Sequence, residues 1–551
     1  MPQEYTLGDY RSPNADILFA LKYGAEVERL DNWDGEIAAE ILENAAKFVE
    51  GEIAPAEPEL DKHEFKLENG RVTVPPVLCK IVEDFVEGGW FGLHLPEEHG
   101  GQELPAVLSN VLFEMIAGAS LNVSMALTAA TAALKLLLSQ GSEDQKARYI
   151  PGILSGEYNA TIVLSEPQAG SDLRLVRTTG TANDDGSWSL QGSKIFISGA
   201  DHNMNPNVLH CIVARTEGAP EGTRGLSLFL CPNVLEDGTR NNVSISGVEE
   251  KMGLHTSPTC QVNFDGAWAE MVGEPGEGLG RMFTMMNAMR LDVAVQGVGA
   301  CQVALQRSAA YAESRIQGRS ISTETTSSEA IPISQHGDVK RMLLTQEALV
   351  QGARAMTLRT AVELALNEHS KLAAVMLHIC KVFASDAACR SADMAIQIHG
   401  GYGYVKDYQV EQIFRDARVA RIYEGANGLH ATNLTTSLRK PAGQENAQAF
   451  EQDIMDAITS GEPATTTALT DALEDWRKAK DHVAEMVDPG MVAYDYLNLS
   501  ALVAFGAAWS RLEGAADKSD DPEHLREVAA FVRERMLPET AYLAKQITRP
   551  S

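Results

Sequence analysis

A block of alternating residues between two helical regions constrains the fold of this chain more than any other feature. From Asn159 to about residue 280, segments such as SWSLQGSKIFIS and CQVNFDG alternate with period two and are rich in β-branched residues. Turn signals such as Asp185-Gly186 separate these segments. Before and after the block, apolar residues recur at helical spacing. The sequence therefore predicts a mainly α-helical protein with a central all-β domain.

The same patterns divide the chain into five parts. At 551 residues and 44% apolar composition, the chain is long enough for several domains with substantial cores. After residue 440 a further apolar stripe, which includes Leu469, Leu473 and Trp476, predicts an added helical domain. The expected parts are an N-terminal arm (1–35), an N-terminal helical domain (36–159), a middle β domain (160–280), a helical bundle domain (281–440) and a C-terminal helical extension (444–551).

The charge balance excludes several kinds of partner. A net charge of −30 and a pI near 4.8 argue against nucleic acid and against anionic membranes. Insertion into a membrane is not expected, because no run of 18 apolar residues occurs.

The N-terminus resembles neither a signal peptide nor a transit peptide, and the seven cysteines include no Cys-x-x-Cys pair, so we expect a cytoplasmic protein. No metal site is expected, since His202 and His210 lack a third ligand.

The stretch from Gln397 to His430 is the first with chemical content. An apolar helical run stops at Gly400-Gly401, and a second helical pattern follows from Val410 to Ala417. Beyond it, Glu424 stands at a helix-to-loop junction, and partial desolvation there would raise its pKa towards the range of a general base. The alternative is an ordinary solvated loop glutamate.

The second such stretch is SEPQAGSD, residues 165–172. Its glycine and small polar residues can present backbone N–H groups and hydroxyls to a phosphate or to the polar edge of a ring. The alternative is an ordinary loop between strands.

Together these two stretches resemble the acyl-CoA dehydrogenase family. That family carries a Gln, a Gly-Gly pair, an aromatic-rich loop, an Arg-Asp helix and a Tyr-Glu-Gly sequence, and its flavin-binding motif is similar to SEPQAGSD. The resemblance covers roughly residues 36–440 and implies a helical domain, a β-barrel-like domain and a four-helix-bundle domain. The arm and the C-terminal extension are similar to the longer bacterial branch that contains the 3-methylmercaptopropionyl-CoA dehydrogenases.

The resemblance also assigns roles to the residues that match its motifs. Glu424 would be the base that removes the α-proton of an acyl thioester. Arg290 would lie near the acyl-CoA, with a structural ion pair as the alternative, and Tyr423 would also bind substrate. The cofactor would be FAD, and its expected contacts are Leu164, Ser165, Ser171, Phe196, Ser198, Arg315, Gln397, Gly400 and Gly401.

Three of these matches carry more detail. Ser171 would contact either the flavin or the pantetheine arm of the substrate. Phe196 and Ser198 stand where the family usually has Trp and Thr. Arg315 would bind the pyrophosphate or adenine portion of the FAD of a neighbouring subunit, and the loop of Gln397, Gly400 and Gly401 would close over the same end. A homodimer or a dimer of dimers is therefore expected.

The implied reaction is FAD-dependent α,β-dehydrogenation of an acyl-CoA to a trans-2-enoyl-CoA, with an electron-transfer flavoprotein as electron acceptor. The extra domain and a methionine-rich helix (Met282, Met285, Met286 and Met289) favour a short acyl chain. The resemblance to the longer bacterial branch implies that the chain could be a sulfur-containing one such as 3-methylmercaptopropionyl. The alternatives are an acyl-CoA oxidase, a desulfinase-like or nitroalkane-type variant, and a non-catalytic acyl-CoA-binding protein.

Overall fold

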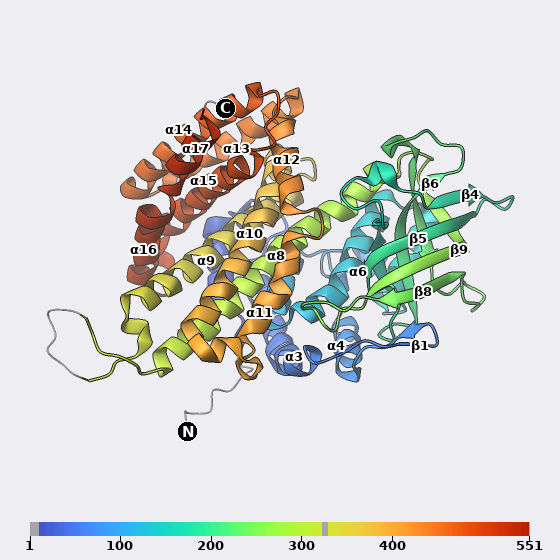
Figure 1. The fold of residues 1–551 in the computed structure, drawn as a ribbon, viewed down its shortest axis with the longest axis horizontal. Coiled ribbons are helices and arrows are strands. Elements are labelled where there is room, and N and C mark those ends of the chain that lie inside the picture. The colour runs from blue at the N-terminus through green and yellow to red at the C-terminus, as the bar shows by residue number, and fades with distance from the viewer. Residues whose placement is uncertain (1–9, 322–328, 550–551) are drawn as a thin grey trace. The chain divides into compact units, whose positions relative to one another are not determined.

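The structure is a computed structural model that describes residues 10–321 and 329–549 (Figure 1). The chain folds into two compact units. The barrel unit comprises residues 51–104 and 120–292, and the helical unit comprises residues 1–50, 105–119 and 293–551. Of the expected N-terminal arm, residues 1–9 lie outside the described part, and the remainder includes α1 (Asn14–Phe19).

The barrel unit is built on a sheet that closes on itself. Its order is β3-β6-β4-β5-β9-β7, and an additional pairing of β6 with β7 joins the two sides into a ring, with β8 attached to β9. The strands are β3 (Tyr158–Val163), β4 (Thr179–Ala182), β5 (Trp188–Ser198), β6 (Asn207–Thr216), β7 (Leu226–Pro232), β8 (Val243–Val248) and β9 (Thr259–Val272). The closed ring leaves few unpaired edges. Leu190, Ile212, Phe229 and Phe264 fill its core.

The helices of the barrel unit come before and after these strands in the chain. They are α3 (Ala54–Leu60), α4 (Pro76–Glu87), α6 (Leu121–Gln140), α7 (Glu143–Leu154) and the beginning of α8 (Gly278–Ser314). A two-stranded hairpin of β1 (Leu67–Glu68) and β2 (Arg71–Val72) joins α3 to α4. Ser142 and Gln145 form a capping box that begins α7, which satisfies backbone N–H groups left over at the helix start. α6 packs against β3.

The helical unit is centred on α10 (Lys371–His399), which packs against α9, α11, α12, α13 and α15. The other helices before residue 440 are α2 (Gly35–Phe48), α5 (Val107–Ala119), the remainder of α8, α9 (Gly337–Leu366), α11 (Val410–Ala417) and α12 (Asn427–Ser437). The described C-terminal extension consists of α13 (Pro441–Ser460), α14 (Pro463–Glu485), α15 (Ala493–Gly514), α16 (Pro522–Phe531) and α17 (Glu539–Ile547).

α15 joins the extension to the rest of the helical unit. It packs against α9, α10 and α12 as well as against α13, α14 and α17. At Gly352 in α9, a Cβ would come within 2.2 Å of the Phe505 ring, so only glycine permits this close approach. The indole N–H of the fully buried Trp509 donates to the Ala348 carbonyl at 3.1 Å. The extension is therefore packed into the helical unit and shares its core.

Buried ion pairs cross-link segments of the helical unit that are distant in sequence. Arg354 donates to Glu114 and to the Gln302 side chain, both at 2.7 Å, and all three are buried. Arg359 and Arg511 both contact Asp453, at 2.9 and 2.8 Å. Because an unpaired buried charge is costly, these pairs fix which helices lie together.

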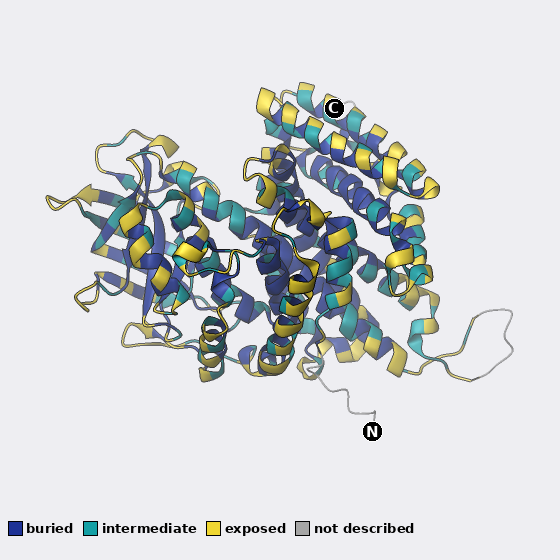
Figure 2. Cartoon of the chain, turned by 180° about the vertical axis from the view of Figure 1, so that it is seen from behind, coloured by how far each residue is buried: buried dark blue, intermediate teal, exposed yellow. Residues whose placement is uncertain are grey.

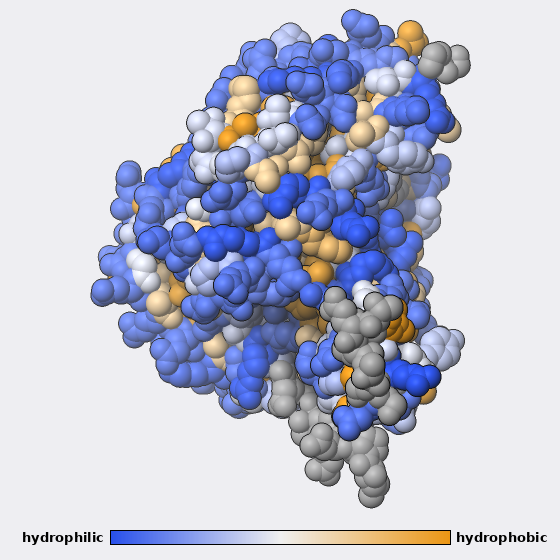
Figure 3. Space-filling model, turned by 90° about the vertical axis from the view of Figure 1, so that its left-hand side faces the viewer, coloured by the Kyte–Doolittle hydropathy of each residue, from blue (hydrophilic) through white to orange (hydrophobic). Residues whose placement is uncertain are grey.

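Apolar residues lie inside the units and polar ones outside. Figure 2 shows buried residues along the inner sides of the helices and sheet, with exposed residues along their outer sides. The face in Figure 3 is largely hydrophilic, with scattered apolar residues. Two described helical stretches, Leu121–Gln140 and Lys371–Tyr404, are long and apolar enough to cross a membrane, but 61% and 78% of their most apolar windows are buried, as in core helices.

The predicted fold class is confirmed: the chain is mainly α-helical with a central β-barrel-like domain and further helices at its C-terminus. The predicted domain limits stay a prediction. All seven cysteines lie in the described residues and are free. Within residues 10–321 and 329–549, no group of three His, Cys, Asp or Glu side chains is placed to hold a metal ion.

Candidate active site

Glu424 lies in a sharp turn of the helical unit. The turn follows a 3-10 helix, Arg418–Arg421, and precedes α12, which begins at Asn427. Glu424 has a φ of 52°, in the left-handed region that non-glycine residues rarely adopt. Gly425 follows with a φ of 91°, where a side chain would be strained and would also come within 2.9 Å of the His430 ring. Such strain persists only where the surroundings hold the backbone in place, and it is common at functional sites.

Two side chains hold the backbone of this turn. The Lys381 ammonium donates to the Gly425 carbonyl at 2.8 Å and to the side-chain oxygen of Asn427 at 2.7 Å. Nε2 of His430 lies 3.0 Å from the Glu424 carbonyl, and since a carbonyl only accepts, the ring donates there. Lys381 is completely buried, so leaving its ammonium without these acceptors would be costly. His430 and Lys381 thus fix the backbone carbonyls of Glu424 and of the residue that follows it.

The neighbouring Tyr423 is held by a helix further back in the chain. Its hydroxyl donates to the side-chain oxygen of Gln296 in α8, and Gln296 is itself buried. Glu424 is half-buried, whereas Ile422 is 58% exposed. The turn therefore offers a carboxylate and an apolar side chain on a fixed backbone, an arrangement suited to proton abstraction from an apolar substrate.

In the barrel unit, a second buried lysine holds the loop that begins with SEPQAGSD. Lys194 in β5 is fully buried and donates to the carbonyls of Leu164 and Val213, at 2.9 and 2.8 Å. It also lies 3.0 Å from the Glu166 carboxylate. The Ile195 N–H donates to the Ser165 carbonyl, at 3.0 Å. These contacts tie the loop to β5.

Glu166 is the anionic centre of that loop. Its carboxylate accepts from the backbone N–H groups of Arg177 and Thr178 at 2.8 and 3.0 Å. Burial alone would raise its pKa, but the Lys194 ammonium and these N–H donors outweigh burial and lower the pKa of Glu166 to about 2. The carboxylate is therefore charged at any physiological pH and orders the loop.

Phe196 is displayed by an irregularity in β5. The pairing of β5 with β9 shifts register between Lys194 and Ile197, and Phe196 within this bulge has a φ of 59°. Phe196 as a whole is 63% exposed, whereas Ile197 is buried. Bulges re-aim side chains, and an exposed aromatic ring on a strained backbone is a candidate binding platform. Ser198 is half-buried two residues on, and Ser171 is exposed at the end of the loop.

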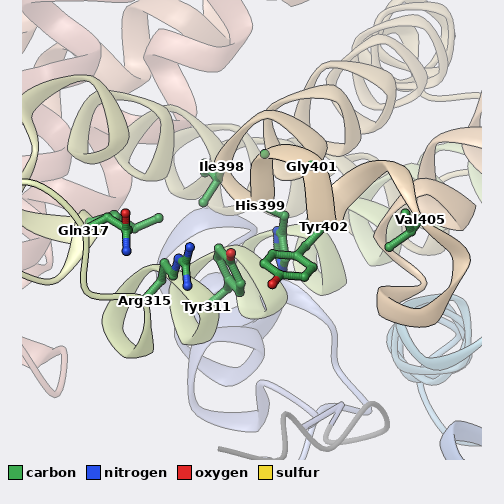
Figure 4. Close-up of a pocket in the computed structure, with 10 residues that line it drawn as sticks. Tyr311, Arg315, Gln317, Ile398, His399, Gly401, Tyr402 and Val405 are labelled. Atoms are coloured by element: carbon green, nitrogen blue, oxygen red, sulfur yellow. The ribbon is translucent and has the colours of Figure 1, made fainter. Parts of the chain in front are cut away.

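A cavity of about 490 Å³ lies in the helical unit, beside the junction of α10 and the loop that follows it. In Figure 4, Arg315, Tyr311 and Tyr402 lie side by side at this cavity. The Arg315 guanidinium is 5.9 Å from the centre of the Tyr402 ring, and Tyr311 stacks on His399 at 4.2 Å. The lining residues are Tyr311, Arg315, Gln317, Ile333, Ile398, His399, Gly400, Gly401, Tyr402 and Val405.

The character of this cavity suits a flat anionic ligand. Burial lowers the pKa of His399 to about 4, so its ring is neutral at physiological pH. Arg315 then adds a cation to a wall of aromatic rings, a combination that binds stacked rings and phosphates. A Cβ at Gly400 or Gly401 would meet no atom within 4 Å, so both glycines face open space.

The predicted site residues thus fall into groups. Arg315, Gly400 and Gly401 line one cavity, and Gln397 lies exposed near the end of α10, outside the lining set. Leu164, Ser165, Ser171, Phe196 and Ser198 lie on the loop and strand that Lys194 joins. Arg290 is buried in the part of α8 that belongs to the barrel unit, where it donates to Asn287 at 2.9 Å and lies over the Phe283 ring.

Sequence reasoning missed the residues that hold these groups in place. The sequence motifs assign no role to Lys194, Lys381 or His430. A lysine within an apolar helical or β pattern is the signal that could have identified Lys381 and Lys194. Lysine is almost never fully buried unless its ammonium is paired. Gln296 carries no comparable signal.

Comparison with known proteins gives three matches to family models. They are "Acyl-CoA dehydrogenase, N-terminal domain" at residues 36–157, "middle domain" at 161–267 and "C-terminal domain" at 276–438. A 3-methylmercaptopropionyl-CoA dehydrogenase of Ruegeria pomeroyi is 37% identical over 82% of this chain and 80% of its own length. A broad-specificity linear acyl-CoA dehydrogenase, FadE5, of Mycobacterium tuberculosis is 33% identical over 78% of this chain and 75% of its own.

A solved structure extends the likeness to the C-terminal helices. ACDH-11 of Caenorhabditis elegans, in complex with C11-CoA, matches with a TM-score of 0.80 and covers 97% of this chain and 93% of its own. Its sequence identity is 19%, so it bears on the fold alone.

Glu166→Gln tests the anionic centre of the barrel-unit loop. Because the folded-state pKa of Glu166 lies below its ordinary value of 4.5, its contribution to stability is present above that value and is lost as pH falls towards 2. The variant should be less stable at pH 7, by about 3–5 kcal/mol if Lys194 loses its anion. Its stability should also fall less steeply with acid than that of wild type. Thermal unfolding at a series of pH values measures both effects.

The matched control for that experiment is Glu221→Gln, at an exposed glutamate of the same unit. It should follow the wild-type pH profile. An equal loss of stability with acid in Glu166→Gln and wild type would show that this carboxylate does not carry the dependence.

Proposed function

Because the chain belongs to the acyl-CoA dehydrogenase family, as its sequence motifs predicted, we propose that it oxidises the Cα–Cβ bond of an acyl-CoA thioester with Glu424 as the base and FAD as the cofactor. The observation that carries the proposal is the strained turn at Glu424, where His430 and Lys381 hold the carbonyls of Glu424 and Gly425. An ordinary solvated loop glutamate would need no such supports.

The residues present fit FAD. Phe196 offers an exposed ring, and the loop from Leu164 to Ser171 offers hydroxyls and backbone groups on a rigid support. In the helical unit, Arg315 with its aromatic neighbours offers a cation and stacking surfaces for a pyrophosphate or an adenine. Phe196 and Ser198 would hold the flavin ring, and Ser165 its polar edge. Arg315 with Gly400 and Gly401 would bind the adenine end of the FAD of a second subunit.

The protein's own groups would have to remove one proton from the substrate and keep water away from it. The α-proton of a thioester is weakly acidic, so a fixed carboxylate must accept it as the Cα–H bond breaks. Glu424 would take this proton, and the electron pair of that bond forms the Cα=Cβ double bond. Bound FAD supplies the acceptor for the hydride that leaves the β-carbon. Ile422 and Tyr423 would exclude water from the carboxylate and the acyl chain.

We propose a short or sulfur-containing acyl chain. The support is the 37% identity to a protein named for 3-methylmercaptopropionyl-CoA, over most of both chains. Three of the four clustered methionines, Met282, Met285 and Met289, are buried, and Met286 is half-buried. Core packing accounts for the buried three, so the substrate proposal rests on the relative and not on them.

Two partners complete the proposal. An electron-transfer flavoprotein would reoxidise the cofactor, as the family resemblance implies. Arg315 and Gln397 would bind the adenine end of the FAD of a second subunit, giving a homodimer or a dimer of dimers, because closed two-fold assemblies bury such a shared ligand from both sides. The exposed Tyr404 and Ile316, at 84% and 54%, lie on the same segments as the cavity residues and support an interface there.

Glu424→Gln tests the base. The amide keeps the shape of the side chain but cannot take a proton. The variant should bind FAD and acyl-CoA, while the rate of flavin reduction in a single turnover falls by roughly 10²–10⁴. Stopped-flow absorbance of the flavin measures this rate.

Glu103→Gln is the matched control, since Glu103 also has a left-handed backbone, with a φ of 52°. It should reduce flavin at the wild-type rate. Near-normal reduction in Glu424→Gln would place the base elsewhere and refute the proposed mechanism.

A panel of acyl-CoAs tests the substrate class. We expect kcat/KM with a dye acceptor to be highest for 3-methylmercaptopropionyl-CoA and for straight chains of three to six carbons. Chains of twelve or sixteen carbons should be turned over less efficiently. A preference for the long chains would refute the substrate proposal, and equal turnover with oxygen in place of the dye would identify an oxidase.

Arg315→Glu tests the shared cofactor. Charge reversal should weaken FAD retention about 10- to 100-fold, the usual value of a charge-assisted hydrogen bond, and should weaken the dimer as well, because bound ligand stabilises the assembly that it bridges. Flavin content after gel filtration and light scattering measure the two effects. Arg319→Glu, at an exposed arginine four residues on, should change neither. A wild-type monomer that retains full FAD would contradict the arrangement.

A further inference from the structure

We propose that Tyr494, in the C-terminal extension, is a positioning residue for Glu424 and acts through the carboxylate of Asp386. The inference rests on the proposed function, in which Glu424 takes the α-proton. It assigns to the extension a part in the reaction through the turn that carries Glu424.

Asp386 in α10 joins the two ends of the Glu424 turn. Its Oδ1 lies 2.5 Å from Nε of Arg421 and accepts a hydrogen bond from the Asn427 side-chain amide at 3.1 Å. Arg421 stands three residues before Glu424, and Asn427 stands three residues after it. One carboxylate therefore spans the turn and restricts how far its ends can separate.

The second oxygen of the Asp386 carboxylate is bound by a residue of the extension. The Tyr494 hydroxyl donates to Oδ2 of Asp386 at 2.6 Å. Burial raises the pKa of Tyr494, and the hydrogen bond to Asp386 raises it further, so the hydroxyl stays protonated and donates at physiological pH. A short bond from a neutral donor to a charged acceptor is strong and directional, and it holds the carboxylate in one rotamer.

Asn427 carries this constraint to the backbone of Glu424. Its amide nitrogen donates to Asp386, and its oxygen accepts from Lys381 at 2.7 Å. The same Lys381 ammonium donates to the Gly425 carbonyl at 2.8 Å. The chain of contacts from Tyr494 through Asp386, Asn427 and Lys381 thus ends one peptide from Glu424.

The support for Tyr494 is rigid. It lies in the first turn of α15, which packs directly against both α10 and α12. Two residues on, Tyr496 is buried against the Trp476 ring in the core of the extension. Movement of α15 would therefore move the hydroxyl relative to Asp386, and the extension is placed to fix the geometry of the turn.

Tyr494→Phe tests the inference because it removes only the hydroxyl. We expect FAD content and the Kd for acyl-CoA to stay within about twofold of wild type, whereas the rate of flavin reduction falls about tenfold, the effect of losing one charge-assisted hydrogen bond. Tyr542→Phe, at a 60% exposed tyrosine of α17, is the surface control and should match wild type.

A purely structural role gives a different result. Tyr496→Phe, at the buried neighbour, should lower the melting temperature without slowing flavin reduction in the folded, FAD-loaded enzyme. If Tyr494→Phe behaves in the same way, with loss of stability and an unchanged reduction rate, the inference is overturned.

A double-mutant cycle tests the path through Asp386. In the Asp386→Asn background, Tyr494→Phe should slow reduction by less than twofold, because the two changes interrupt the same chain of contacts. A full tenfold effect in that background would show that Tyr494 acts independently of Asp386 and would refute the proposal.

Glu424→Gln, measured in parallel, separates this inference from the proposed function. Near-normal reduction in Glu424→Gln overturns the proposed function and the inference with it. Loss of reduction in Glu424→Gln together with wild-type behaviour of Tyr494→Phe overturns only the inference.

Discussion

The hydrogen bonds of two fully buried lysines fix the loops on which the proposed chemistry depends. Lys194 donates to the Leu164 carbonyl in the barrel unit, and Lys381 donates to the Gly425 carbonyl in the helical unit. A buried ammonium is tolerated only when acceptors converge on it, so each lysine requires its loop to fold around it. β5 places Lys194, and α10 places Lys381. The regular structure of each unit thereby sets the position of an irregular loop.

The same supports explain why strained residues occur where they do. Phe196 and Glu424 both have positive φ values. Phe196 lies two residues after Lys194, and Glu424 precedes Gly425, whose carbonyl accepts from Lys381. Left-handed conformations of such residues cost of order 1–3 kcal/mol each. That cost is small beside the loss of satisfied acceptors around a buried ammonium, so the lysine contacts outweigh the strain. The backbone is then pre-organised before a ligand binds.

Much of the fold and part of the site could be predicted from the sequence, and the limits have a physical origin. The change from period-two to helical patterning reports which face of each element is buried, and it located the β domain between two helical regions. It does not report which helices pack together: residues 105–119 have an ordinary helical pattern, yet α5 belongs to the helical unit whereas α4 and α6 belong to the barrel unit. The pairing follows from contacts such as Glu114 with Arg354, 240 residues apart.

The site shows the same division. Glu424 could be singled out because local motifs surround it, and its assigned role stays a prediction. The residues that hold the Glu424 turn could not be identified from the sequence. Lys381 lies 44 residues before its partner Gly425, and Tyr494 lies 108 residues after its partner Asp386. Nothing local in the sequence marks such pairs. Hydrogen-bond partners of this kind become visible only once the fold has brought their elements together.

The contacts of the C-terminal extension show whether it is a separable domain or part of the helical unit. A domain added to a complete enzyme would be expected to meet it through a polar, separable surface. Here α15 is buried against α9, α10 and α12, its Trp509 donates to a backbone carbonyl of α9, and Arg511 shares Asp453 with Arg359. Removing the extension would expose the apolar face of α10, the helix that carries Lys381 and Asp386. The extension is therefore part of the framework that holds the Glu424 turn, and changes within it can reach the turn through packing alone.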